Sequence, residues 1–475
     1  MDFQYTTKNE PVRKYKPNSK EKKSLLDEYH RMANQIIEIP LIIGGKGVRT
    51  GNTAKCVMPH NHQHTLANYH LAGKKEVNKA IGDSLKSWEN WSKSSSKHRT
   101  KIFRKAADLL KGEWRDRINA ATMLNQSKNA FQAEIDSACE LIDFFNFNAE
   151  YAEKINRHQP LISPGGVKNY LEYRPLEGFV FAITPFNFTS IAANLPCAPA
   201  VMGNVSIWKP ASSAVLPCYY LMELLQEAGL PDGVINFLPG SGGTVGNPVL
   251  KDPNLAGVHF TGSTKTFQHI WKTIGSQIES YKTYPRIVGE TGGKDFCLAH
   301  ESVDIDELTT AMIRGAFEYQ GQKCSAMSRA YIPTSIWNEL KSKYLSELKS
   351  VKIGPPDNFS NFMNAVIDKK AFKSIILRLH PFEDTNSFLS FLSKNKIKLF
   401  LDDHNISLFE SSLGYSNVVS STTSESLFEI IYNPSSNIFI YSRDETSIIS
   451  EMFSNEKSIY IIERSQNFRI ESKWP

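Results

Sequence analysis

One stretch indicates the fold: Gly178-Phe179-Val180-Phe181-Ala182-Ile183, followed at once by Thr184-Pro185-Phe186-Asn187. A short apolar run between glycine and proline is typical of a buried strand. Similar runs follow at Val205–Trp208, Val234–Leu238 and Gly257–Phe260, with helical patterns at Pro217–Ala228 and Thr264–Ile274. Apolar strands that alternate with helices predict βαβ units, and therefore an α/β fold with a parallel sheet covered by helices on both faces.

Polar residues stand where these strands end. Thr184 to Asn187 follow the first strand, Lys209 follows the second, and Thr261-Gly262-Ser263 follow the fourth and open the next helix. Open α/β sheets bind nucleotides outside the carboxyl ends of their strands, and a helix N-terminus there favours phosphate. The glycine-rich run Gly240–Gly246 lacks an acidic residue about 20 positions on, so a plain turn explains it at least as well as a dinucleotide motif.

A carboxylate and a thiol, each among glycines, lie further along. They are found in Gly289-Glu290-Thr291-Gly292-Gly293-Lys294 and in Gly321-Gln322-Lys323-Cys324-Ser325-Ala326. An exposed thiol with a base nearby suits covalent catalysis. The alternative is an inert packing thiol, which is the commoner state of a lone cysteine. A strand pattern at Ser328–Ile332 and a helical pattern at Ile336–Lys349 follow this loop.

The N-terminal part reads differently. A polar tail over residues 1–30 precedes strand-like runs at Ile36–Val48 and Cys56–Leu71, and residues 74–157 are helical in pattern. Within Glu134–Ile155 an apolar stripe recurs at helical spacing: Ile135, Ala138, Ile142, Phe145 and Ala149. Glu140 lies off that stripe, which by itself predicts a solvated position.

Bulk composition excludes several classes of protein. The chain has 475 residues and a net charge of +6, and residues 1–23 alone contribute +4, with seven basic and three acidic residues. A nearly neutral body argues against nucleic-acid binding. No apolar run reaches the eighteen or so residues of a membrane span. Six scattered cysteines without paired spacing indicate reduced thiols, no metal site and a cytoplasmic protein.

Taken together, these motifs resemble the aldehyde dehydrogenase superfamily, and within it the enzymes that oxidise L-glutamate γ-semialdehyde. The resemblance extends from about Asn9 to Asp368. The motifs that carry it are Glu140–Phe145, Pro185–Thr189, Trp208–Pro210, Phe260–Ser263, Gly289–Glu290 and Phe317–Ala326. It implies a Rossmann-type parallel-sheet domain that binds NAD, joined to an α/β catalytic domain.

The resemblance also implies roles for individual residues. Cys324 matches the nucleophile, which adds to the aldehyde as thiolate and gives a thiohemiacetal and then a thioester. Asn187 matches the amide that stabilises the oxyanion. Glu290 matches the base that activates water for thioester hydrolysis. The expected NAD contacts are Thr184, Lys209, Gly262, Ser263, Thr264, Lys265 and Thr266, and the expected substrate contacts are Lys323, Ser325, Phe188 and Glu140.

On this basis four regions are expected: a tail over 1–30, an NAD-binding domain with an N-terminal helical segment over 31–295, a catalytic domain with the nucleophile loop over 296–370, and a divergent remainder over 371–475. The expected partner is a small-molecule aldehyde. A homodimer is expected from the family, and in a eukaryote the mitochondrial matrix is the alternative compartment.

The last region departs from the family pattern. It has one glycine, Gly414, and no alanine after Ala371, although runs such as Asn437–Tyr441 and Ser458–Ile462 still predict strands. Where the family has a Glu and a Phe that hold the nicotinamide ribose, Ile430 and Tyr432 stand here. An alkyl group accepts no hydrogen bond from ribose, and the family's glycine-rich substrate loop is missing. Two alternatives therefore stay open: a catalytically impaired or non-catalytic homologue, and a dehydrogenase for another small aldehyde.

Overall fold

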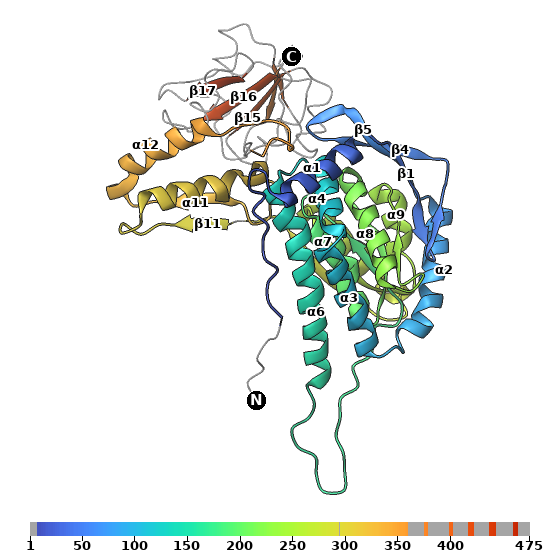
Figure 1. Cartoon of the computed structure of the whole chain (residues 1–475). Coiled ribbons are helices and arrows are strands. Elements are labelled where there is room, and N and C mark those ends of the chain that lie inside the picture. The colour runs from blue at the N-terminus through green and yellow to red at the C-terminus, as the bar shows by residue number, and fades with distance from the viewer. Residues whose placement is uncertain are drawn as a thin grey trace. The chain divides into compact units, whose positions relative to one another are not determined.

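The structure, a computed structural model, describes residues 7–293 and 295–359, and the backbone of five strands between residues 375 and 463. The chain divides into two compact units. The first runs to Gly292 and also includes Pro356–Phe359, and the second begins at Gly293. Figure 1 colours both units by residue number.

A seven-stranded sheet forms the centre of the first unit. Its order is β10 (Arg286–Thr291), β9 (Leu255–Gly262), β6 (Phe179–Ile183), β7 (Val205–Lys209), β8 (Ile235–Phe237), β2 (Leu41–Ile43) and β3 (Lys46–Val48). Strands β6 to β10 are parallel, whereas β2 is antiparallel to β8 and β3. From β6 the chain builds outward through β7 and β8, and then returns to β9 and β10 on the other side of β6. This reversal is the topological switch point at which such sheets bind nucleotides, and the predicted parallel sheet is confirmed.

Helices cover both faces of this sheet. Between the parallel strands lie α7 (Thr189–Val201), α8 (Val215–Ala228), α9 (Gly242–Leu250) and α10 (Thr264–Ser276). His259 of β9 bonds to the Leu195 carbonyl of α7 at 2.9 Å, whereas the next residue, Phe260, stacks on Phe267 of α10. Because successive side chains of a strand point to opposite faces, α7 and α10 lie on opposite sides. Helix α2 (Lys74–Trp91) packs against the sheet and α9.

More helices belong to the first unit: α1 (Lys20–Ala33), α3 (Ser96–Lys111), α4 (Trp114–Gln126) and α6 (Glu140–Arg157). Helix α1 packs on α4, and α3 packs on α6 (Figure 1). The expected polar tail over 1–30 is therefore wrong from Lys20 onward. Ser19 caps α1, and the helix buries Leu25 and Met32 because these apolar positions recur on one face.

A π-helix, Glu134–Cys139, joins α5 (Ala130–Ala133) to α6. It explains why one member of the predicted apolar stripe is misplaced. Ile135 has 38% of its surface exposed, whereas Ala138 and Ile142 are buried. A π-turn holds more residues per turn than an α-helix, so Ile135 falls out of register with the stripe that follows it.

Shorter elements complete the first unit. A small sheet has the order β1 (Ile37–Ile39), β5 (Asn61–His70) and β4 (Thr53–Met58), and single turns of 3₁₀-helix cover Ser212–Ala214 and Ile278–Ser280. The chain from His158 to Gly178 forms a long irregular loop between α6 and β6 (Figure 1).

In the second unit, β11 (Asp295–Leu298) and β12 (Met327–Tyr331) pair in parallel, and α11 (Ile305–Phe317) packs on α12 (Thr334–Ser350). The two helices share a core that includes Leu308, Met312, Leu340 and Tyr344. A separate parallel sheet has the order β14 (Leu399–Leu401), β13 (Ile375–Arg378), β15 (Asn417–Ser421), β16 (Asn437–Ser442) and β17 (Ile459–Glu463). Strands β16 and β17 confirm the two strands predicted for the divergent region.

Candidate active site

The sheet brings four of its strand ends to one edge. Ile183, the last residue of β6, pairs with Lys209 of β7 on one side and with Phe260 of β9 on the other. On the far side of β9, Thr291 of β10 pairs with Gly262. The polar residues that follow these strands therefore gather around the switch point between β6 and β9, as the sequence predicts.

Thr184 is held firmly at this edge. Its side chain is buried, and its hydroxyl oxygen accepts a hydrogen bond of 3.0 Å from the indole N–H of Trp208. Its backbone N–H donates to the Lys209 carbonyl at 3.2 Å. Because both bonds join β6 to β7, Thr184 has one defined position beside Lys209.

Lys209 ends β7 with its ammonium group turned toward the chain that follows. Nζ donates to the Pro210 carbonyl at 3.1 Å, and burial lowers the pKa of this lysine to about 8. A lysine with so little access to water gains from any polar ligand that replaces its hydration. Ribose hydroxyls are ligands of that kind.

Helix α10 begins directly after β9. Its N-cap, Ser263, accepts a hydrogen bond of 3.2 Å from the Thr266 N–H and lies 2.8 Å from the Thr266 hydroxyl. No acidic residue lies in the first turn, so the partial positive charge of the helix end is not cancelled there. Thr264 and Lys265 are exposed in the same turn. The site suits a phosphate group.

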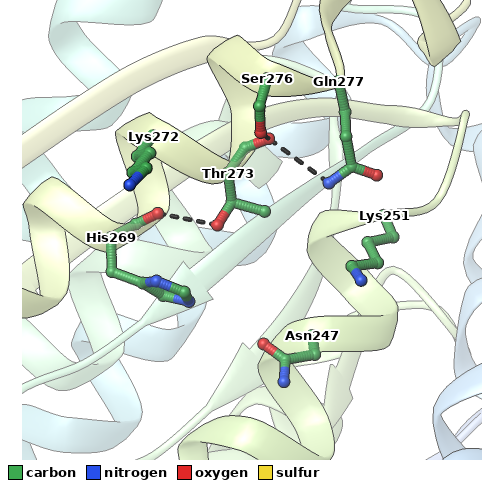
Figure 2. Close-up of a pocket in the computed structure, with 7 residues that line it drawn as sticks. All are labelled: Asn247, Lys251, His269, Lys272, Thr273, Ser276 and Gln277. Atoms are coloured by element: carbon green, nitrogen blue, oxygen red, sulfur yellow. Dashed lines mark hydrogen bonds between the residues drawn. The ribbon is translucent and has the colours of Figure 1, made fainter.

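The glycine-rich run before β9 is not a plain turn, which was one of the two alternatives that the sequence left open. Gly242 begins α9, and Ser241 caps the helix by accepting a hydrogen bond of 3.1 Å from the Thr244 N–H. Between α9 and α10 lies a hollow of about 460 Å³ (Figure 2). Its lining is polar or basic and contains no acidic side chain: Asn247, Lys251, His269, Lys272, Thr273, Ser276 and Gln277.

Asn187 and Phe188 occupy the loop between β6 and α7. Asn187 is half-buried, and Phe188 is buried at the N-cap position of α7. In the first turn of α7, the Ser190 hydroxyl donates to the carboxylate of Glu140 at the start of α6. Glu140 is therefore a half-buried, hydrogen-bonded carboxylate, and the solvated helix face expected from its periodicity is wrong.

Glu290 lies on the edge strand β10, where its backbone pairs with Thr261 and its side chain is exposed. The preceding residue is glycine for a steric reason. A Cβ atom on Gly289 would lie 2.1 Å from the ring of Phe267, which packs over this strand from α10.

Cys324 lies in a tight turn of the second unit. The Ala326 N–H donates to the Lys323 carbonyl at 3.0 Å, which makes Cys324 and Ser325 the two central residues of a β-turn. Lys323 is 3.8 Å from the carboxylate of Glu318. The thiol and a paired cation are thus adjacent on the short connection between α11 and β12.

Unusual backbone geometry precedes this turn. Tyr319 and Gln320 have φ angles of 52° and 53°, and Gly321 follows with 70°. Tyr319 and Gln320 are both buried. Positive φ at a residue other than glycine costs about 1–3 kcal/mol and is found most often at functional sites. The 3₁₀-turn Glu318–Gly321 is therefore a strained stretch directly before the Cys324 turn.

The six cysteines are all free thiols, as the sequence predicts. Burial raises the pKa of Cys56 and Cys139 to about 12, and raises the pKa of Cys197 and Cys218 as well. These four thiols are therefore unreactive at neutral pH. Cys297 and Cys324 are partly exposed, and of the two only Cys324 lies in a turn beside a lysine.

The predicted site residues divide between the units. The first holds Thr184, Asn187, Phe188, Lys209, Gly262–Thr266, Glu140 and Glu290, and the second holds Lys323, Cys324 and Ser325. Ile430 and Tyr432 lie outside the described residues. The sequence pointed to Trp208 only as part of a motif and did not point to Ser190. The contacts by which these two residues fix Thr184 and Glu140 span 24 and 50 residues. No periodicity or motif signals such contacts.

Comparison with known proteins gives consistent results. The model of the aldehyde dehydrogenase family matches residues 48–378. The chain is 47% identical over 372 residues to a mitochondrial delta-1-pyrroline-5-carboxylate dehydrogenase of Dictyostelium discoideum, covering 78% of this chain and 67% of that protein. It is 44% identical over 368 residues to the enzyme of the same name from Rattus norvegicus, covering 77% and 65%. The chain thus spans about two thirds of the length of these relatives.

Solved structures agree. The delta-pyrroline-5-carboxylate dehydrogenase of Mycobacterium tuberculosis superposes with a TM-score of 0.75 at 36% identity, covering 93% of this chain and 88% of that one. Its NAD-bound structure superposes with a TM-score of 0.74 at 34% identity, covering 100% and 91%.

Proposed function

The chain belongs to the aldehyde dehydrogenase family, and we propose that it oxidises L-glutamate γ-semialdehyde, the open form of Δ1-pyrroline-5-carboxylate, to L-glutamate with NAD. One observation carries the proposal: the segment that matches the family, residues 48–378, contains Asn187, Glu290 and Cys324. Relatives at 44–47% identity bear the name of this activity.

Cys324 is the proposed nucleophile. Its thiolate adds to the aldehyde carbon, and the carbonyl oxygen becomes an oxyanion. The turn centred on Cys324 and Ser325 leaves the thiol partly exposed, and Lys323 beside it favours the thiolate over the thiol. The four buried cysteines lack this exposure.

Asn187 and Glu290 complete the proposed chemistry. The Asn187 side-chain amide donates a hydrogen bond to the oxyanion, an interaction that typically accounts for about 10²–10³ in rate. Glu290, exposed on β10, accepts a proton from the water that hydrolyses the thioester, and so releases the acid. Both steps, hydrogen-bond donation by an amide and proton acceptance by a carboxylate, are ordinary chemistry of these side chains.

The first unit fits NAD. The order of its parallel strands reverses between β6 and β9, and this switch point is flanked by Thr184, Lys209 and the N-terminus of α10. Lys209 would hold a ribose hydroxyl, and the first turn of α10 from Thr264 would hold a phosphate. NAD, when bound, supplies the hydride acceptor for the oxidation.

The proposed substrate contacts suit an amino acid that carries an aldehyde. Lys323 offers a positive charge to the substrate carboxylate, and Glu140 offers a negative charge to its ammonium group. Ser325 offers a hydroxyl, and Phe188 offers an aromatic wall for the methylene chain. In charge, these side chains are complementary to glutamate semialdehyde.

A second candidate is the oxidation of another small aldehyde. It is favoured by the missing glycine-rich substrate loop, since no glycine follows Gly414. The first candidate requires the carboxylate and ammonium groups of the substrate, whereas the second does not. Steady-state kcat/KM for glutamate semialdehyde and for butanal, an aldehyde without charged groups, distinguishes them.

We expect glutamate semialdehyde to be preferred by at least about a hundredfold, because two charged contacts are lost with butanal. Equal rates would favour the second candidate. Folded protein that oxidises neither aldehyde at saturating NAD would identify a non-catalytic homologue.

For compartment and assembly, the proposal is a homodimer in the cytoplasm or the mitochondrial matrix, both of which keep thiols reduced. The proposed compartment is supported by the free cysteines and by the mitochondrial relatives. Among the described residues no helix is both long and apolar enough to cross a membrane. Light scattering of the purified protein gives its assembly directly.

A further inference from the structure

The loop that carries Asn187 is anchored by one short stretch of the chain, the C-terminal end of α4 and the residues after it. The Thr189 hydroxyl lies 2.8 Å from that of Thr122 and accepts a hydrogen bond of 2.7 Å from the Gln126 side-chain amide. All of these groups are buried. These hydrogen bonds to α4 therefore fix the chain next to Asn187 and Phe188.

Lys128 extends this support to the side chain of Phe188. Helix α4 ends at Gln126, and its C-cap residue, Ser127, turns the chain sharply with a φ of 55°. Lys128, the next residue, is fully buried, and its ammonium nitrogen lies 4.2 Å from the centroid of the Phe188 ring. This distance is well within the range of a cation–π interaction.

The buried charge of Lys128 is balanced by the π-helix. Its ammonium group lies 2.5 Å from the carboxylate of Asp136, which is itself buried. Replacing a buried ion pair with apolar residues of similar size is often neutral or stabilising, so stability alone does not account for this pair. The same π-helix leads into Glu140, the carboxylate that accepts a hydrogen bond from Ser190 in the first turn of α7.

We infer that Lys128, paired with Asp136, is a positioning residue for the aldehyde site: it holds the Phe188 ring by a cation–π contact and thereby fixes the adjoining Asn187 amide. This inference rests on the proposed function. Lys128 acts through its contact with Phe188 and takes no part in the chemical steps proposed for Cys324, Asn187 and Glu290. It sets the orientation of the aromatic wall and of the oxyanion donor, whereas binding of NAD at the switch point does not depend on it.

The test removes both charges while keeping both sizes, in K128M/D136N, and measures kcat, KM for aldehyde and NAD, and the melting temperature. We expect kcat to fall about thirtyfold, the size of a lost buried cation–π contact, with KM for NAD unchanged. K128R keeps the cation and should retain most of kcat. The matched control K79M/D83N removes an exposed Lys–Asp pair of the same unit and should leave kcat unchanged.

A coupling measurement separates positioning from general stability. In an F188L background the charges have no ring to hold, so adding K128M/D136N should lower kcat no further. An equal fall in both backgrounds, or unchanged kcat in K128M/D136N, would overturn the inference. Should K128M/D136N fail to fold, K128Q replaces it in the same cycle.

Failure of the proposed function is a different result, namely wild-type protein without turnover. In that case crystal structures of wild type and K128M/D136N decide the inference. A displaced Phe188 ring and Asn187 amide would support it, and unchanged positions of both would contradict it.

Discussion

The backbone of Gly293 lies directly against the carbonyl group of Cys324. A Cβ atom at position 293 would be 1.4 Å from that oxygen. The glycine-rich stretch after Glu290 thus has a structural role in the nucleophile turn of the second unit. Only glycine permits so close an approach of two backbone segments.

G293A should therefore displace the Cys324 turn and lower kcat by at least about tenfold, because the clash is with backbone that has to move. G275A is the matched control, since a Cβ atom there meets nothing within 4 Å and Gly275 lies inside α10. Steady-state rates of both variants are the measurement. Normal turnover in G293A would show that the turn is not held in this conformation.

N187A should lower kcat by about 10²–10³ while the Kd for NAD stays the same, because the oxyanion loses one hydrogen-bond donor. The Kd is measured by titration calorimetry, which does not depend on turnover. A parallel loss of NAD affinity would assign Asn187 to the cofactor site.

E290Q should separate the two halves of the reaction. With the base removed, the thioester forms but is hydrolysed slowly, so rapid mixing should show a burst of about one NADH per active site followed by a slow phase. E279Q, on an exposed glutamate outside the site, serves as control. Loss of the burst together with the steady rate would mean that Glu290 acts before the thioester forms.

The stability of the protein should depend on pH through Lys209. Its pKa is about 8 when folded against 10.5 for an ordinary lysine, so between these values the unfolded chain binds more protons at this site. The cost of burying the ammonium is present below pH 8 and is relieved as pH rises toward 10.5, by roughly 3 kcal/mol at most.

K209M has no such group. The free energy of unfolding of wild type, measured relative to K209M in urea from pH 7.5 to 10.5, should therefore increase with pH. A constant difference would show that Lys209 keeps an ordinary pKa.

Local pattern was sufficient for much of the fold. The apolar runs that became β6, β7 and β9 are buried on both faces, so composition alone identifies them, and their order placed Thr184, Lys209 and Ser263 at one edge. The prediction errors arose where irregular helix geometry or tertiary packing overrode the local sequence pattern. The π-helix moved Ile135 out of its stripe, and packing against α4 turned part of a charged tail into α1.

The residues that position Phe188 and Glu140 could not be predicted from the sequence, for a different reason. Lys128 and Phe188 are 60 residues apart along the chain and meet only through tertiary packing, as do Ser190 and Glu140. Isolated lysines and serines are ordinarily surface residues. Nothing in the neighbouring sequence sets these two apart, and only the folded chain shows what they hold.

The central claim is that Cys324 carries the oxidation of L-glutamate γ-semialdehyde. The most direct measurement is the joint yield of NADH, by absorbance, and of L-glutamate, by mass spectrometry, from wild type, C324A and C297A with NAD and the semialdehyde. We expect equal amounts of the two products from wild type and from C297A, whose thiol lies on β11, and neither product from C324A. Turnover by C324A, or folded wild-type protein that forms neither product, would contradict the claim.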